Sequence, residues 1–132
     1  MKVSVHLIFD GRCQEAFERY AQLLGGEIVT MLPYGETPMA EQVPADWRDK
    51  IVHATMTLGE LMLSGADVAA EQYQRPQGFY VLLHPDAPSE AQRIFEALSE
   101  DGRVALPLQQ TFWSPCFGVV VDRFGTPWEI SC

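Results

Sequence analysis

The residue that most clearly offers chemistry is Glu129, an acid between Trp128 and Ile130 in the last apolar run of the chain. Three interpretations are open: a metal ligand, a catalytic base, or an exposed group on a half-buried strand. In an apolar cavity without a metal, desolvation raises the pKa of a carboxyl group and makes it a candidate general base. The structural alternative is a hydrogen bond to Ser64 or to an arginine, or a place in solvent, because strand alternation alone does not say which face is inward. Glu129 is therefore the candidate catalytic residue.

Six aromatic residues supply the flat apolar surface of a small-molecule pocket, to which tyrosine and tryptophan add a polar group. They are Phe79, Tyr80, Phe112, Trp113, Phe117 and Trp128. Ordinary core packing is the alternative for most of them. Core packing is the favoured interpretation for most of the six.

Three cysteines, Cys13, Cys116 and Cys132, leave one thiol unpaired in any disulfide scheme, and no CxxC pair is present. Neither a disulfide framework nor a zinc ribbon is predicted. Cys116 is a candidate nucleophile, but no histidine lies near it in sequence. We expect reduced, mostly buried thiols, with Cys116 inert.

The composition limits the class of protein. A chain of 132 residues with 47% hydrophobic residues suits one domain, or two small halves that share a core. A formal net charge of -9 disfavours binding to nucleic acid or to anionic membranes. No stretch of about 18 apolar residues and no secretory signal is seen, so a cytoplasmic location is expected.

The first half predicts the order strand, helix, strand, strand, strand. The helix starts at Cys13, has apolar residues at spacings of three and four, and stops at Gly25-Gly26. Strands are expected at 3–11, 27–34, 51–59 and 60–64. The long loop 35–50 is a candidate lid anchored by Trp47, or else a surface excursion that covers a sheet edge or a dimer contact.

The second half repeats this order. A helix is expected from about Ser89, where Gln92 would complete a capping box. Strands are expected at 78–84, 103–110, 114–122 and 128–131. The chain is therefore predicted to be one α+β domain, 1–132, with βαβββ modules at 1–66 and 77–132, a linker at 67–76, and curved mixed sheets around a cavity.

Three sequence blocks carry a resemblance to a known superfamily. They are FDGRCQEAFERY (9–20) followed by Gly25-Gly26, WRDKIVHATMTLGELMLSGAD (47–67), and QQTFWSPCFGVVVDRFGTPWEIS (109–131). With the internal repeat, the chain resembles the vicinal oxygen chelate superfamily of glyoxalase I, extradiol dioxygenases and bleomycin-binding proteins, and in particular its PhnB-like branch. Members of this branch are often described as demethylubiquinone methyltransferases, yet this sequence has no glycine-rich turn for a nucleotide-like cofactor.

The resemblance implies up to four metal-ligand positions, on the first and last strands of each half. Laid onto the repeat, which pairs His6 with Val81, they fall at or near Ser4, Met62, Phe79 and Glu129. Only Glu129 is a strong ligand for a hard divalent ion, so metal-dependent chemistry is disfavoured. The alternative is an altered metal site made by His6, His53 and Glu129.

The predicted function is metal-free binding of a small molecule in an aromatic-lined cavity, without a cofactor. The expected ligand-binding residues are His6, His53, Gln110, Trp113 and Trp128, with Glu129 as a further polar group. The alternative is a lyase, isomerase or dioxygenase that uses a divalent metal ion or an acid-base pair. The resemblance also implies a homodimer.

Overall fold

The computed structural model describes residues 1–132 and contains two compact units, Met1–Gln74 and Arg75–Cys132. Each unit is a four-stranded mixed sheet with one helix, in the order βαβββ. The elements of the first unit are β1 (Val5–Phe9), α1 (Cys13–Leu24), β2 (Glu27–Pro33), β3 (Ile51–Leu58) and β4 (Leu61–Asp67). Those of the second are β5 (Val81–Leu83), α2 (Pro88–Ser99), β6 (Arg103–Gln109), β7 (Phe117–Val121) and β8 (Pro127–Ser131). The predicted α+β class and the internal repeat are confirmed.

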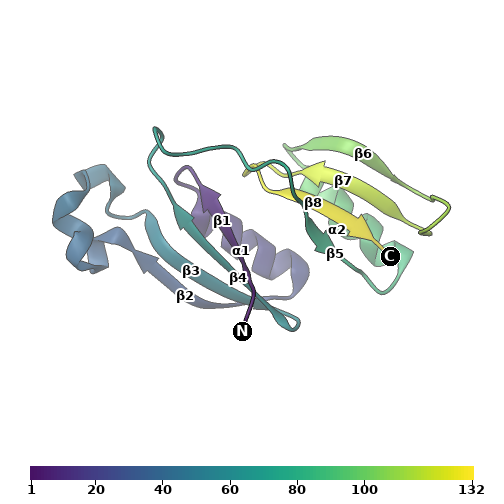
Figure 1. The fold of residues 1–132 in the computed structure, drawn as a ribbon, viewed down its shortest axis with the longest axis horizontal. Helices are drawn as coiled ribbons and strands as arrows, with labels where there is room; N and C mark the ends of the chain where they lie inside the picture. Colours follow the sequence, from purple (N-terminus) through teal and green to yellow (C-terminus); the bar gives the residue numbers. More distant parts are fainter. The chain divides into compact units, whose positions relative to one another are not determined.

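In the first unit the strand order is β1-β4-β3-β2, with β1 parallel to β4 and the other neighbours antiparallel (Figure 1). Helix α1 packs its predicted apolar stripe on this sheet, and Ala16, Phe17 and Tyr20 have no exposed surface. The helix ends where expected, because Gly25 takes a left-handed conformation with φ 74° and donates its N–H to the carbonyl oxygen of Ala21.

In the second unit the strand order is β5-β8-β7-β6. The predicted stripe of α2 is confirmed as buried: Ala91, Ile94, Phe95 and Leu98. The predicted capping box is wrong. The helix begins at Pro88, which suits the first helical position, and the Gln92 amide donates to Glu96 at 3.0 Å instead.

Several boundaries differ from the expected ones. Strand β4 continues through Asp67, which the sequence had placed in the linker. The strand expected at 78–84 shrinks to Val81–Leu83, and the loop after β2 folds into three short 3-10 turns, the last at Ala45–Trp47. Neither helix is long and apolar enough to cross a membrane.

The expectation of reduced cysteines is wrong for two of the three. Cys116 and Cys132 form a disulfide, whereas Cys13 is free and buried. The two half-cystines flank neighbouring antiparallel strands, and the Cys132 N–H donates to the Cys116 carbonyl oxygen at 3.0 Å. Strand pairing therefore brings together two residues that are 16 positions apart in sequence.

Candidate functional site

Each sheet has one face against its helix and one helix-free face. In β4, a Cβ built on Gly65 would lie 2.7 Å from the ring of Phe17 in α1. In β7, a Cβ built on Gly118 would lie 2.8 Å from the ring of Phe95 in α2. Because successive strand residues point to opposite faces, the neighbours of these glycines in sequence define the helix-free faces.

The helix-free face of the first sheet holds both candidate histidines. His6 lies opposite Ser64, which lies opposite Thr55, and His53 is two positions before Thr55 on the same face. Burial lowers the pKa of His6, and the nearby charge of His53 lowers it further. The structure thus brings the two imidazoles into electrostatic contact, with strand β4 between their strands. Met62 shares this face.

Glu129 lies on the helix-free face of the second sheet. It is opposite Val119 in β7 and Leu82 in β5, while the flanking Trp128 and Ile130 point towards α2. Its side chain is half-buried, and no hydrogen bond or ion pair engages its carboxylate. No arginine pairs with this carboxylate and no serine donates a hydrogen bond to it, so it is available to a ligand.

The repeat alignment of the first strands needs one correction. Val81 pairs with Trp128 and so faces α2, whereas His6 lies on the helix-free face of its own sheet. Residues of opposite orientation cannot occupy equivalent positions, so the pairing of His6 with Val81 is wrong by one residue. The alignment of the two helices was correct, since α1 begins at Cys13 and α2 at Pro88, but the same shift in numbering does not align the first strands of the two units.

Trp128 is placed in the core. Its side chain has no exposed surface, and its indole N–H donates to Oδ2 of the buried Asp122 at 2.9 Å. The same carboxylate accepts the backbone N–H groups of Phe124 and Thr126 and so fixes the β7–β8 turn. Contrary to the sequence-based expectation, Trp128 has no free surface with which to contact a ligand.

Trp113 and Gln110 lie in the β6–β7 connection. Trp113 is 57% exposed and makes edge-on contacts with Phe112 and Phe117, at centroid separations of 4.6 and 5.3 Å. Gln110 is exposed. Phe112, Trp113 and Phe117 form an aromatic cluster, and neither this cluster nor Gln110 lines either of the two pockets described next.

The second unit contains a pocket of about 250 Å³ beside the helix-free face of its sheet. Val119, Val121 and Pro127 form its floor, and the segment 75–80 passes over it. The full lining is Arg75, Pro76, Gln77, Gly78, Phe79, Tyr80, Arg103, Ala105, Val119, Val121 and Pro127. Two of the six predicted pocket aromatics, Phe79 and Tyr80, are therefore in place. Neither arginine was predicted as a site residue, because no motif in the sequence marks Arg75 or Arg103.

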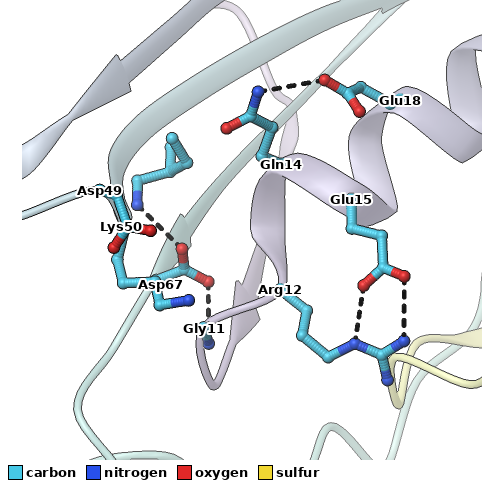
Figure 2. Close-up of a pocket in the computed structure, with 9 residues that line it drawn as sticks. Gly11, Arg12, Gln14, Glu15, Glu18, Asp49, Lys50 and Asp67 are labelled. Atoms are coloured by element: carbon cyan, nitrogen blue, oxygen red, sulfur yellow. Dashed lines mark hydrogen bonds and ion pairs between the residues drawn. The ribbon is translucent and has the colours of Figure 1, made fainter. Parts of the chain in front are cut away.

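The first unit contains a polar pocket of about 370 Å³ at the start of α1 (Figure 2). At its base Asp67, 1% exposed, accepts the N–H groups of Gly11, Cys13 and Ile51 at 3.0, 2.9 and 2.8 Å. Burial raises the pKa of Asp67, and these three bonds and the charge of Lys50 act in the opposite direction. Asp67 therefore joins three elements and caps α1 from another strand.

The other acids at this pocket are largely engaged. Glu15 binds Arg12 at 2.9 Å, and Glu18 accepts the Gln14 amide at 3.1 Å, as Figure 2 shows. No group of three His, Cys, Asp or Glu side chains that could hold a metal ion is formed. The imidazoles of His6 and His53 lie in the first unit, and the carboxylate of Glu129 lies in the second. Neither unit alone therefore holds the three ligands of a catalytic zinc site or the two histidines and one carboxylate of an iron site.

Comparisons of the sequence and the fold with known proteins identify a family and several similar structures. Residues 1–131 match the family described as 3-demethylubiquinone-9 3-methyltransferase. Protein YjdN of Escherichia coli K12 is 30% identical over 99% of this chain and 95% of its own length. The crystal structure of PA1353 from Pseudomonas aeruginosa is 42% identical, with a TM-score of 0.90 over 100% of this chain and 97% of that one.

Two further structures share the fold. A PhnB protein from Bacillus cereus, described as a putative 3-demethylubiquinone-9 3-methyltransferase, is 24% identical with a TM-score of 0.85 over 99% of this chain and 98% of that one. A glyoxylase/bleomycin resistance protein/dioxygenase domain from Frankia is 12% identical with a TM-score of 0.67 over 99% and 95%. The fold expected from the suspected superfamily is thereby confirmed, and the chain belongs to the family described as 3-demethylubiquinone-9 3-methyltransferase, with protein YjdN as a relative.

Proposed function

We propose that this protein binds a small molecule without a metal ion. The observation that carries the proposal is the pocket of the second unit, which combines an apolar floor with two aromatic side chains. Its volume of about 250 Å³ lies just below the usual range of about 300–1,000 Å³ for ligand pockets, which favours a small ligand. Glu129 lies on the same face of the same sheet, opposite Val119, but outside the pocket lining, and would be a further polar group near the bound ligand.

The histidines and the exposed connection are secondary parts of the proposal. His6 and His53 offer two nitrogen donors or acceptors on the first sheet. Gln110 and Trp113 would close over a ligand from the β6–β7 connection. Because none of these four lines the pocket, their substitution is expected to affect binding less than changes at the pocket wall.

An acid-base enzyme is the second candidate. It is favoured by one specific observation: the half-buried carboxylate of Glu129 makes no ion pair or hydrogen bond. Such a group is free to accept a proton from a bound substrate. The metal-dependent lyase, isomerase or dioxygenase would need an altered site of His6, His53 and Glu129, and it is disfavoured because only Glu129 among the four positions that the family implies is a strong ligand for a hard divalent ion.

Methyl transfer is not proposed, although the family carries that description. A nucleotide-like cofactor commonly binds at a glycine-rich turn between a strand and a helix, where free backbone N–H groups contact it. In the first unit that position is already filled by the Asp67 carboxylate, which accepts the N–H groups of Gly11 and Cys13.

A pocket-filling substitution tests small-molecule binding. Ala105→Phe would place a ring in the pocket, and Val104→Phe would add the same ring at the neighbouring residue, which does not line it. We expect ligands found by a ¹H–¹⁵N NMR screen of small aromatic compounds to shift pocket amides in the wild type and in Val104→Phe, but not in Ala105→Phe. Equal shifts in both variants would refute this pocket as the site.

The metal-free part has a separate test. Elemental analysis of protein purified without chelator is expected to find no stoichiometric divalent metal. A stoichiometric metal that is lost in Glu129→Ala would overturn the proposal in favour of the altered metal site. We also propose a homodimer in the cytoplasm, to be checked by light scattering and by cell fractionation.

A further inference from the structure

We infer that the pocket of the second unit selects small ligands that carry an anionic group, such as a carboxylate, phosphonate or sulfonate, on a flat apolar body. The inference rests on the proposed function and deepens it by naming the ligand class. Arg75 and Arg103 would hold the anion, while Phe79 and Tyr80 would cover the apolar part.

The distribution of charge is the first argument. The chain has 18 acidic and 9 basic residues, yet two of the basic residues and none of the acidic ones line this pocket. The pocket wall therefore carries two positive charges in a protein whose net charge is -9. A cationic site of this kind attracts anions against the general repulsion of the surface.

The second argument is that both guanidinium groups lack a carboxylate partner. The salt bridges of the chain engage other arginines, among them Arg12 with Glu15 and Arg123 with Glu100. Arg75 and Arg103 take part in none of them. An arginine presents a planar fork of donors that matches a carboxylate or phosphonate in two parallel hydrogen bonds, so a bound anion would supply the missing acceptors.

The third argument concerns the aromatic rings beside these arginines. Phe79 and Tyr80 line the pocket together with Val119 and Val121, and their side chains are 43% and 51% exposed. A ligand ring between them and the floor would remove apolar surface from water. The pocket of about 250 Å³ has room for about one ring with its acidic group, not for a nucleotide.

The test compares phenylphosphonate with its neutral counterpart benzyl alcohol, each titrated into ¹⁵N-labelled protein at low salt and at about 150 mM salt. We expect phenylphosphonate to shift the amides of Gly78, Tyr80 and Val119 and to bind about tenfold more tightly than benzyl alcohol, as charged hydrogen bonds imply. Its affinity should fall as the salt concentration rises.

Charge-removing variants complete the design. Arg75→Gln and Arg103→Gln are each expected to weaken phenylphosphonate several-fold and to leave benzyl alcohol unchanged. The matched control is Arg93→Gln, which removes the same charge from an exposed position on α2. Because all three positions are exposed, the variants should fold, as their NMR spectra will show.

The outcomes separate the two proposals. Equal affinity for the two probes, or an Arg93→Gln effect as large as that of Arg75→Gln and Arg103→Gln, refutes the anion preference while small-molecule binding stands. If neither probe shifts the pocket amides, both the anion preference and small-molecule binding in this pocket are refuted. Loss of phenylphosphonate binding in the two pocket variants alone establishes the inference.

Discussion

The most informative single substitution for the fold is Asp67→Ala. The Asp67 carboxylate accepts three backbone N–H groups, and two of these bonds, from Cys13 and Ile51, are buried. A buried donor left without a partner costs about 1–3 kcal/mol, so these two bonds predict a loss of about 2–6 kcal/mol. Relief of the cost of burying the charge offsets part of this, and water can reach the Gly11 N–H. We expect a net loss of about 2–4 kcal/mol in the free energy of unfolding.

Asp67→Asn should have a smaller effect. Its amide oxygen can keep the bonds from Gly11 and Cys13, but its NH₂ group cannot accept the Ile51 N–H, so about 1–3 kcal/mol should be lost. The control is Asp49→Ala, an exposed acid at the same pocket, expected to change stability by less than about 0.5 kcal/mol.

Urea unfolding followed by circular dichroism measures these differences, and hydrogen exchange at the Ile51 and Cys13 amides reports the local effect. Loss of protection at both amides in Asp67→Ala, and at Ile51 alone in Asp67→Asn, is the expected pattern. If Asp67→Ala is no less stable than Asp49→Ala, Asp67 does not hold α1, β3 and β4 together and the reasoning fails.

Three further predictions follow from other contacts. An NMR titration should place the pKa of His6 below its usual 6.5, so the free energy of unfolding should decrease as the pH falls from 6.5 through this lowered folded-state pKa. The variant His53→Gln should raise the pKa of His6 only in part, because burial is the larger cause of the shift. An unchanged pKa in this variant would show that the two imidazoles do not interact. Trp128→Phe should lower the free energy of unfolding in urea by about 1–2 kcal/mol, because its buried hydrogen bond is lost. The control Trp113→Phe, at an exposed position, should leave the free energy of unfolding nearly unchanged. Equal effects of the two variants would contradict the core position of Trp128. Protein denatured without reductant should show one reactive thiol per chain, that of Cys13, and protein denatured after reduction should show three. Three reactive thiols before reduction would exclude the disulfide.

Much of the secondary structure was readable because the signals are local. The apolar stripe of α1 and the glycine that ends it lie within one stretch of sequence, and the structure confirms both. The capping box failed because Pro88, one residue before Ser89, is itself a good first helical residue. The strand expected at 60–64 was ended too early, because a polar residue such as Ser64 or Asp67 after an apolar run is most simply taken as the start of a loop.

The candidate site was readable only in part. Glu129 stood out because an acid breaks the apolar pattern of its strand, and Phe79 and Tyr80 were identified as aromatic pocket residues. Arg75 and Arg103 were not singled out, because they are 28 residues apart and an isolated arginine is usually a surface group. Trp128 was assigned to a ligand because the sequence gives its amphipathic side chain but not the buried Asp122 carboxylate that binds it.

Residue periodicity and contiguous sequence blocks were enough to predict the repeated βαβββ order, the buried stripes of both helices and the family. Tertiary structure decided which strand faces the helices leave free, which carboxylate caps α1, and which cysteines are joined. It also decided that two distant arginines share a pocket wall. Each of these depends on strand register and on contacts between residues far apart in the chain, and a shift of one residue reverses the face on which a side chain lies.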